Sequence, residues 1–423
     1  MKTNIRFFQC VMKVSIVLSA IFLAGVCLSA AYANSFNPQS FPLLHPENLI
    51  YQGAFKLPAG TIGGSSFNYG GGAVLAYNPQ NNSLLIVGHD NHQMVAEINI
   101  PAPIVSSEEA NLPTAALIQP FADPSEGKIF TIDDSLQNKA GGLLVFNNRL
   151  YGSAFSWFDV NHSQILSHYV SSLDFSNVKA SQGMFQLGET GAGFVSGYMT
   201  LIPEEWREAL GGPALTGNCC IPIIARSSLG PAAFTFNPLD VGTKSPIPAI
   251  PLVYYPHSNP LGEWSSTNPY FNGSTRIKGL VLPPSSRSLL FIGRHGQGTW
   301  CYGIGGAEGE CPDPTNSNKA NHAYPYANQV WAYDVLDLIQ AKNGALNPWE
   351  VKPYKIWNFT LPFESEGYGP VLGVSNDPST QRIFIAHDRG SKPPIIHVFK
   401  SNHVSTWEDS SPPTSPKNLV IMP

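Results

Sequence analysis

Short apolar runs in this chain repeatedly end in side chains that can bind anions or transfer protons. These run ends are His89-Asp90, Phe155-Ser156, Arg226-Ser227, Arg294-His295 and His387-Asp388. Arg226 and Arg294, together with the histidines, could hold a carboxylate, sulfate or phosphate through charge-assisted hydrogen bonds. Asp90 or Asp388 could orient its neighbouring histidine as a general base. The pattern predicts an anion site, and binding is expected to tighten as the histidines protonate below about pH 6.5.

The same histidines allow a second interpretation, a metal centre. His89, His295 and His387 could ligate a transition metal with one position left open for water or substrate. Neighbouring arginines disfavour a metal, so the anion site is the first interpretation. Calcium is a further alternative, with Glu366 or an oxygen-rich loop supplying its ligands. The oxygen donors in that loop are Asp313, Asn316 and Asn318.

Two carboxylates, Glu364 and Glu366, lead into the run before His387 and suggest carbohydrate chemistry. Glycoside hydrolysis requires a pair of carboxylates, and aromatic side chains can stack on sugar rings. The aromatic candidates are Trp157, Trp264, Trp300, Tyr302 and Tyr368. Three functions therefore stay open. They are a hydrolase or lyase acting on a small anionic or glycan-derived substrate, a non-catalytic module that binds carbohydrate or a surface partner, and polar groups that only satisfy one another.

The elements that must position these residues form a repeat. Each copy is a Gly-led apolar strand, an Asn/Pro/Ser turn and a second apolar strand with a polar end. The clearest copies are Gly71–Asp90, Gly279–His295 and Gly369–Asp388. Short strands repeating every 40–75 residues or so are typical of a β-propeller. We expect an all-β fold, a single closed β-propeller with five four-stranded blades, or six if the segments 101–140 and 296–328 contain further strands.

The strand assignment also predicts where a ligand site lies. Ile50–Pro58 resembles Tyr354–Pro362, the outer strand before the last repeat, so the N-terminal strand is expected to complete the last blade. Blade three is expected to use Ile221–Ala225 as its second strand, after a short helix at Glu204–Leu210. Long aromatic and polar loops collect at the end of the ring where second strands stop and inner strands begin. Because binding sites lie on such loops, this face is the predicted site.

At blade level, the segments 369–388 and 71–90 resemble NHL-like and gluconolactonase-like propellers. The shared order is an inner strand led by Gly-Pro or Gly, a polar turn, and a second strand ending in Asp. The resemblance implies a propeller fold. Those relatives usually have six blades, so no metal site is carried over from them.

Composition restricts the class of protein. Residues 1–33 combine Lys2, Arg6 and Lys13 with an apolar segment and Ala31-Tyr-Ala33, the pattern of a signal peptide. Its removal would change the formal net charge from −5 to −8, which argues against nucleic acid and anionic membranes as partners. No other stretch is long and apolar enough to span a bilayer. We expect a periplasmic or secreted monomer with an extension at 34–49, the propeller at 50–400 and a Ser/Pro-rich tail at 401–423.

Four cysteines remain after the predicted cleavage. In an oxidising compartment an even number favours disulfides. Cys301 and Cys311 bracket a Gly-rich loop and are the expected pair. Cys219 and Cys220 are adjacent, and three states stay open for them: a vicinal disulfide, free thiols, or cross-pairing to the 301/311 loop.

Overall fold

The computed structural model describes residues 37–69, 73–133, 137–177, 180–221, 226–364 and 369–402. The chain divides into two units at Pro38, and all the strands belong to the second unit, Gln39–Pro423. The predicted signal peptide, Glu366, Tyr368 and the tail from residue 403 onward lie outside the described residues. Among the described residues, no helix combines the length and the apolar character needed to cross a membrane.

Five four-stranded antiparallel sheets form a ring, which confirms the five-bladed β-propeller. Blade one consists of β2 (Leu75–Asn78), β3 (Ser83–Val87), β4 (Val95–Asn99) and β5 (Leu117–Ala122). Blade two consists of β6 (Asn138–Phe146), β7 (Arg149–Ser156), β8 (His168–Ser172) and β9 (Gln182–Phe185). Blade three consists of β10 (Met199–Leu201), β11 (Ala214–Thr216), β12 (Ala233–Phe236) and β13 (Ala249–Val253).

The remaining two blades contain the C-terminal half of the ring and its closure. Blade four consists of β14 (Arg276–Val281), β15 (Ser288–Gly296), β18 (Tyr326–Asp334) and β19 (Lys355–Phe359). Blade five consists of β20 (Val371–Asp377), β21 (Arg382–His387), β22 (Ile395–Ser401) and β1 (Leu49–Lys56). Because β1 pairs with β22 along its whole length, the N-terminal strand completes the last blade, as predicted.

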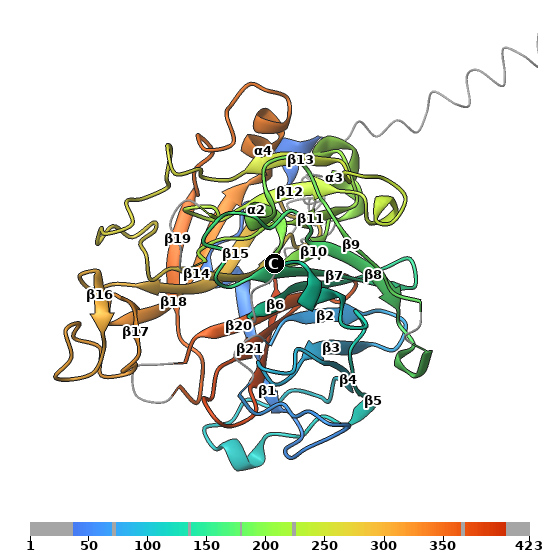
Figure 1. Cartoon of the computed structure of the whole chain (residues 1–423), viewed down its shortest axis with the longest axis vertical. Helices are drawn as coiled ribbons and strands as arrows, with labels where there is room; N and C mark the ends of the chain where they lie inside the picture. Colours follow the sequence, from blue (N-terminus) through green and yellow to red (C-terminus); the bar gives the residue numbers. More distant parts are fainter. Residues whose placement is uncertain are drawn as a thin grey trace, which may run out of the picture. The chain divides into compact units, whose positions relative to one another are not determined.

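The inner strands β2, β6, β10, β14 and β20 contact one another in that order around the ring (Figure 1). Leading glycines allow this close approach. A Cβ on Gly142 would overlap the carbonyl oxygen of Gly197 in the next blade, and one on Gly373 would overlap the carbonyl oxygen of Ala73. Glycine is therefore required where neighbouring backbones meet.

Apolar side chains fill the space between neighbouring blades. Phe55 and Ile86 meet Phe384 between blades five and one, and Leu144 meets Phe234 between blades two and three. The other three blade interfaces contain equivalent clusters. Because each blade buries both faces against its neighbours, the strands are apolar almost throughout.

Few helices interrupt the sheets in the described part of the chain. The α-helices there are α2 (Ala192–Val195), α3 (Glu204–Leu210) and α4 (Val335–Lys342). Short 3₁₀ turns are found at Pro38–Ser40, Pro46–Asn48, Glu109–Asn111, Lys128–Thr131, Phe175–Asn177 and Pro238–Asp240. The helix α3 has the bounds that the sequence predicted. It ends at Gly211, whose φ of 86° suits glycine after a helix.

The second strand of blade three corrects a prediction. The structure uses Ala214–Thr216, which pairs with both β10 and β12, where the sequence suggested Ile221–Ala225. The predicted strand is the more apolar and longer of the two, but pairing in the sheet follows tertiary contacts and not local hydrophobicity. As a consequence, Arg226 does not stand at the end of a second strand.

A two-stranded hairpin of β16 (Cys301–Ile304) and β17 (Lys319–His322) projects from blade four (Figure 1). Cys301 and Cys311 form a disulfide with a Cα–Cα distance of 5.6 Å, which confirms the expected pair. The Asp313 carboxylate accepts hydrogen bonds from His322 Nδ1 at 2.7 Å and from the Tyr326 hydroxyl at 2.6 Å. This carboxylate, one of the predicted calcium ligands, therefore holds the hairpin against blade four.

Candidate functional site

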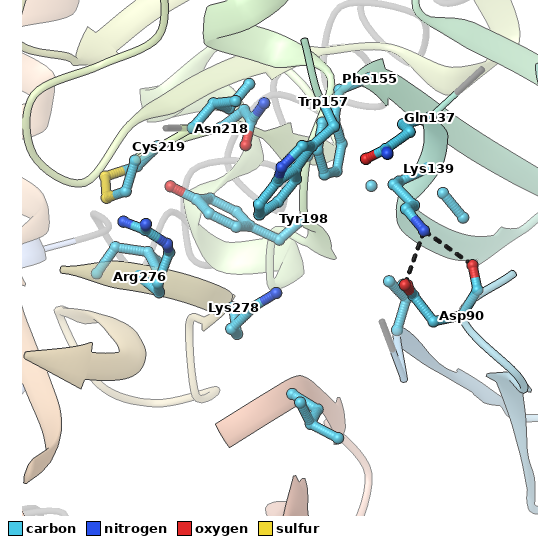
Figure 2. Close-up of a pocket in the computed structure, with 18 residues that line it drawn as sticks. Asp90, Gln137, Lys139, Phe155, Trp157, Tyr198, Asn218, Cys219, Arg276 and Lys278 are labelled. Atoms are coloured by element: carbon cyan, nitrogen blue, oxygen red, sulfur yellow. Dashed lines mark hydrogen bonds and ion pairs between the residues drawn. A yellow bond between two sulfur atoms is a disulfide. The ribbon is translucent and has the colours of Figure 1, made fainter. Parts of the chain in front are cut away.

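A cavity of about 320 Å³ lies on the propeller axis, at the end of the ring where inner strands begin and second strands stop. Its walls come from all five blades and combine cationic, aromatic and sulfur-containing side chains (Figure 2). The side chains used below are Asp90, Lys139, Trp157, Tyr198, Cys219, Cys220, Arg276 and Lys278. A cavity of about 90 Å³ lies at the opposite end. Of these two cavities at the ends of the ring, the larger lies on the face that the sequence predicted for a site.

Three cations line this axial pocket, and each belongs to the start of an inner strand. Lys139 is in β6, and Arg276 and Lys278 are in β14. Asp90, after β3, is the one carboxylate among the described residues that line the cavity. The pocket is therefore locally positive, although the formal net charge of the chain is −5.

Lys139 and Asp90 form an ion pair across the boundary between blades one and two. Lys139 Nζ donates to Asp90 Oδ2 at 2.7 Å and to the Asp90 carbonyl oxygen at 3.0 Å (Figure 2). Gln93 accepts a hydrogen bond from the Ala140 backbone at 2.7 Å, which fixes the same boundary. The charge of Lys139 is therefore compensated within the wall of the pocket.

Backbone bulges recur at equivalent positions of three inner strands, and each bulged residue lines the pocket. In β14, Ile277 pairs with Gly293 and Gly279 pairs with Ile292, so Lys278 is the extra residue. The equivalent extra residues are Gly141 in β6 and Leu372 in β20. Bulges redirect side chains, and here they aim the extra residue at the axis.

The Lys278 amine points into the pocket (Figure 2). In the part of the chain that the structure describes, it has no hydrogen-bond or ion-pair partner. Burial, followed by the positive charge of Arg276, lowers the pKa of Lys278 to about 8. The carboxylates of Asp90 and Asp388 act in the opposite direction. A lowered pKa leaves a larger fraction of this amine neutral at pH 7 than for an exposed lysine, and the neutral amine is the form that can act as a nucleophile.

Cys219 and Cys220 form a vicinal disulfide in the pocket wall, which settles the three alternatives left open by the sequence. Both cysteines are buried. Asn218, Trp157 and Tyr198 continue the wall around them (Figure 2). This part of the pocket presents the disulfide and aromatic surface, and the disulfide lies beside Arg276.

The predicted histidines do not converge. His89 stacks on His92 with ring centroids 4.5 Å apart. His295 lies between the Thr275 hydroxyl and the Asn268 carbonyl, each at 3.0 Å. Within the described residues, no group of three or more His, Cys, Asp or Glu side chains is arranged to hold a metal ion.

His387 lies at the end of β21 in a chain of hydrogen-bonding side chains. Its Nδ1 is 3.2 Å from His397 Nε2, and His397 Nδ1 is 3.1 Å from the Tyr51 hydroxyl. Burial lowers the pKa of His387 to about 4. The predicted tightening of anion binding depends on histidines that gain a proton near pH 6.5. His387 gains its proton only at lower pH. Its neighbour Asp388, whose pKa is raised by burial, acts on Lys278 through its charge.

The two predicted arginines occupy different places. Arg226 is buried and donates to the Ser156 carbonyl oxygen, and burial lowers its pKa to about 10. Arg294 stacks over Tyr326, 4.4 Å from the ring centroid, in a separate hollow beside Glu364. Neither guanidinium lines the axial pocket. Of the residues singled out from the sequence, Asp90, Phe155 and Trp157 line it.

Among the predicted aromatic residues Trp157 lines the axial pocket, whereas Trp300, Tyr302 and the carboxylate Glu364 lie elsewhere. Trp300 donates to Asn321 within the hairpin at 3.2 Å, and Tyr302 is exposed on the same hairpin. Glu364 accepts hydrogen bonds from Asn328 at 2.8 Å and from the Leu361 backbone at 3.1 Å. Its predicted partner Glu366 lies outside the described residues.

The sequence did contain a signal for the cations of the pocket. Lys278 directly precedes Gly279 at the head of a repeat, where the equivalent residues are Gly141 and Leu372. A charged residue at the start of an otherwise buried inner strand is unusual, because the axis is crowded. Searching the first residues of inner strands, in addition to the ends of second strands, would have found Lys139, Arg276 and Lys278.

No protein-family model matches this chain, and no curated protein matches it. Solved structures that align with it include the following two. One is a luciferin-regenerating enzyme at 7% identity, with 78% of this chain and 76% of that chain covered and a TM-score of 0.33. The other is a protein of unknown function from Dyadobacter fermentans DSM 18053 at 7% identity, with 85% of this chain and 100% of that chain covered and a TM-score of 0.37. At these values neither structure bears on the site or the activity of this chain.

Proposed function

We propose that this protein binds a small organic anion in the axial pocket. The observation that carries the proposal is the convergence of Lys139, Arg276 and Lys278 on one cavity, whose described lining residues include a single carboxylate. Asp90 compensates Lys139, so three cations against one carboxylate leave an excess of positive charge among the described lining residues. In a partly enclosed site such an excess is costly unless an anion compensates it. Charge-assisted hydrogen bonds from arginine and lysine suit carboxylate, sulfate and phosphate groups.

Size and wall chemistry narrow the ligand class. The volume of about 320 Å³ is at the lower end of the range for small-molecule sites, roughly 300–1,000 Å³. Trp157, Tyr198 and the Cys219–Cys220 disulfide offer apolar surface to the body of the ligand. A small carboxylate with a flat or apolar body fits both the volume and the wall chemistry of the pocket. Among glycan-derived ligands, a sugar acid belongs to this class.

Titration calorimetry on the chain from residue 37 onward tests this proposal, with benzoate, pyruvate, glucuronate and sulfate as probes. We expect saturable binding that weakens with added salt. Arg276→Met should weaken binding at least tenfold, since a hydrogen bond to a charged group contributes about 1.5–3 kcal/mol. Lys319→Met, which removes a hairpin cation outside the pocket, is the matched control. Absence of binding for every probe, or an equal loss in both variants, would refute the proposal.

A hydrolase or lyase acting on the bound anion is the second candidate. The amine of Lys278, which has no hydrogen-bond or ion-pair partner within the described ranges, favours it. The predicted catalytic roles of His89, His387, Asp388 and Glu366 belong to this candidate. A non-catalytic propeller that recognises carbohydrate or a surface partner is the alternative. Turnover of a bound probe, followed by chromatography, separates the two.

Export and family membership are part of the same proposal. The signal-peptide pattern of residues 1–33 supports secretion or a periplasmic location, and two disulfides within the described residues are compatible with it. The mass of the mature protein recovered from its host should correspond to cleavage after Ala33. Membership among NHL-like or gluconolactonase-like propellers rests on the blade repeat alone, and none of their sites is transferred.

A further inference from the structure

We propose that Lys278 is a nucleophile that forms a Schiff base with a small oxo acid bound in the axial pocket. The ligand class is a carboxylate with a neighbouring aldehyde or ketone carbonyl, such as a 2-oxo acid. This inference rests on the proposed function, because the pocket must first hold the anion. It adds a covalent step and names the reacting atom, Lys278 Nζ.

The backbone places this amine at the axis. Lys278 is the extra residue of the β14 bulge, and it is followed by Gly279, against which Val374 of blade five packs closely. The neighbouring blade therefore limits movement of the backbone that carries the lysine. The equivalent extra residues, Gly141 and Leu372, have no reactive group. Lys278 is thus the functional group that the repeated bulge presents to the cavity.

The surroundings keep the amine available for reaction. Lys139 is occupied by Asp90 at 2.7 Å, whereas the Lys278 amine has no hydrogen-bond or ion-pair partner among the described residues. Burial and the cations Arg276 and Arg294 favour its neutral form, while Asp90 and Asp388 favour the charged form. With a pKa of about 8, a neutral amine is present in about a tenth of molecules at pH 7, against less than about 0.1% for an ordinary lysine.

The same strand supplies a site for the carboxylate of the ligand. Arg276 lies two residues before Lys278 in β14, and both side chains line the pocket (Figure 2). Two residues of a strand span roughly 6–7 Å, and both side chains are long, so one small molecule can contact both. Arg276 Nη1 donates to the carbonyl oxygens of Gly273 at 3.1 Å and Thr275 at 2.6 Å, which holds the positive charge of the guanidinium at the pocket wall. A ligand carboxylate attracted to this charge leaves its adjacent carbonyl carbon for the amine.

The chemistry is balanced without an oxidant or a reductant. The lone pair of neutral Lys278 Nζ attacks the carbonyl carbon, a C–N bond forms, and the carbonyl oxygen takes a proton to give a carbinolamine. The C–O bond then breaks, and this oxygen leaves as water after taking a second proton. The nitrogen loses two protons overall, so amine and carbonyl give imine and one water. The two protons that the nitrogen loses equal the two that the oxygen gains, so the balance requires no further acid or base.

Borohydride trapping tests the proposal. The chain from residue 37 onward is incubated with glyoxylate, pyruvate or phenylpyruvate, reduced with sodium borohydride, digested and mapped by mass spectrometry. We expect one dominant reduced adduct at Lys278 with at least one probe. Its yield should rise about tenfold or more from pH 6 to pH 8, as the amine loses its proton. Lys278→Arg should abolish the adduct, and Lys319→Arg should leave its yield unchanged.

Parallel calorimetry separates this inference from the proposed function. Lys278→Arg keeps the positive charge, so it should bind sulfate more tightly than Lys278→Met does. Binding of sulfate by Lys278→Arg also shows that this variant is folded. Binding of the oxo acids without an adduct, or adducts spread evenly over surface lysines, would overturn the Schiff base and leave anion binding intact. Absence of both binding and adduct would overturn both proposals.

Discussion

Burial determines what individual histidines can do in this protein. His168, His295, His387 and His397 are buried, and burial lowers the pKa of each. The pKa of His168 falls to about 3, and that of His295 to about 4. At neutral pH these imidazoles are therefore uncharged and hydrogen-bonded inside the blades. A positive charge at the axis comes instead from lysine and arginine.

This burial predicts a loss of stability in acid. The pKa of His168 in the folded chain, about 3, is below its unfolded value near 6.5, so below pH 6.5 the unfolded chain binds more protons. The contribution of neutral His168 to the free energy of unfolding is complete above about pH 6.5. Below that pH it is lost at about 1.4 kcal/mol per pH unit as the pH falls. The free energy of unfolding is measured in urea at pH 7.5 and at pH 5.0. In His168→Gln the difference between these two values should be smaller than in the wild type by about 2 kcal/mol.

The exposed His162 provides the control for this measurement. His162→Gln should leave the difference between pH 7.5 and pH 5.0 as it is in the wild type, because the side chain is exposed. The comparison uses the difference between two pH values, so any general destabilisation by the substitution at His168 cancels. An unchanged difference in His168→Gln would contradict the account.

At the scale of single elements, the inner strand combines two requirements. Its glycine allows the next blade to approach, and the bulged residue before that glycine faces the pocket, as Lys278-Gly279 and Leu372-Gly373 show. The glycine was visible in the sequence because it repeats. The role of the preceding residue was not, because a bulge depends on pairing with the second strand.

Because neighbouring blades approach closely at Gly373, a side chain added there should lower the free energy of unfolding. In Gly373→Ala the new Cβ would overlap the carbonyl oxygen of Ala73, a backbone atom that cannot rotate away. We expect a loss of about 2–3 kcal/mol in the free energy of unfolding, the upper part of the range for overpacked sites. Urea unfolding measures it.

Gly344→Asn is the control for this substitution. Gly344 follows α4 with a φ of 76°, and a Cβ added at this position would have no heavy atom within 4 Å. Asparagine tolerates that backbone conformation, so its effect should stay below about 1 kcal/mol. Equal losses in both variants would show that the blade contact at Gly373 is not what limits substitution.

Sequence reasoning succeeded for elements with strong periodic patterns and failed for weak ones. The repeat, the closing strand and the helix α3 were predictable because each has its own local signature. The three-residue strand Ala214–Thr216 was not, because the longer apolar run after Cys220 gave the stronger signal. That error moved Arg226 into the predicted site. Asp90 and Trp157 were candidates from the sequence alone, whereas the placement of Lys139, Arg276 and Lys278 depends on the pairing of the blades.

At the scale of the whole molecule, ring closure couples the blades. Each neighbouring pair of blades shares a buried apolar cluster, and β1 supplies the outer strand of blade five. A ring in which every blade packs on two neighbours has no natural end at which unfolding can begin. We therefore expect the described unit to unfold in one cooperative transition.

Removing the closing strand should destabilise the entire ring. A chain that starts at Ala59 lacks β1 and leaves the edge of β22 unpaired, and it also loses Phe55 from the cluster between blades five and one. We expect this chain to be unfolded or aggregated, as judged by circular dichroism and light scattering. A chain that starts at Asn37 keeps β1 and should remain folded. If the shortened chain lost the structure of blade five alone and kept the other blades folded, the claim that ring closure couples the blades would be contradicted.

The charge of the whole molecule and the charge of its axial pocket have opposite signs, which is the central claim of the account. A crystal of the chain from residue 37 onward, soaked in bromide and measured at the bromine absorption edge, tests it most directly. We predict an anomalous peak inside the axial pocket between Arg276 and Lys278, and a weaker or absent peak in crystals of Arg276→Met. Bromide confined to the outer surface of the blades, with none in the pocket, would contradict the claim.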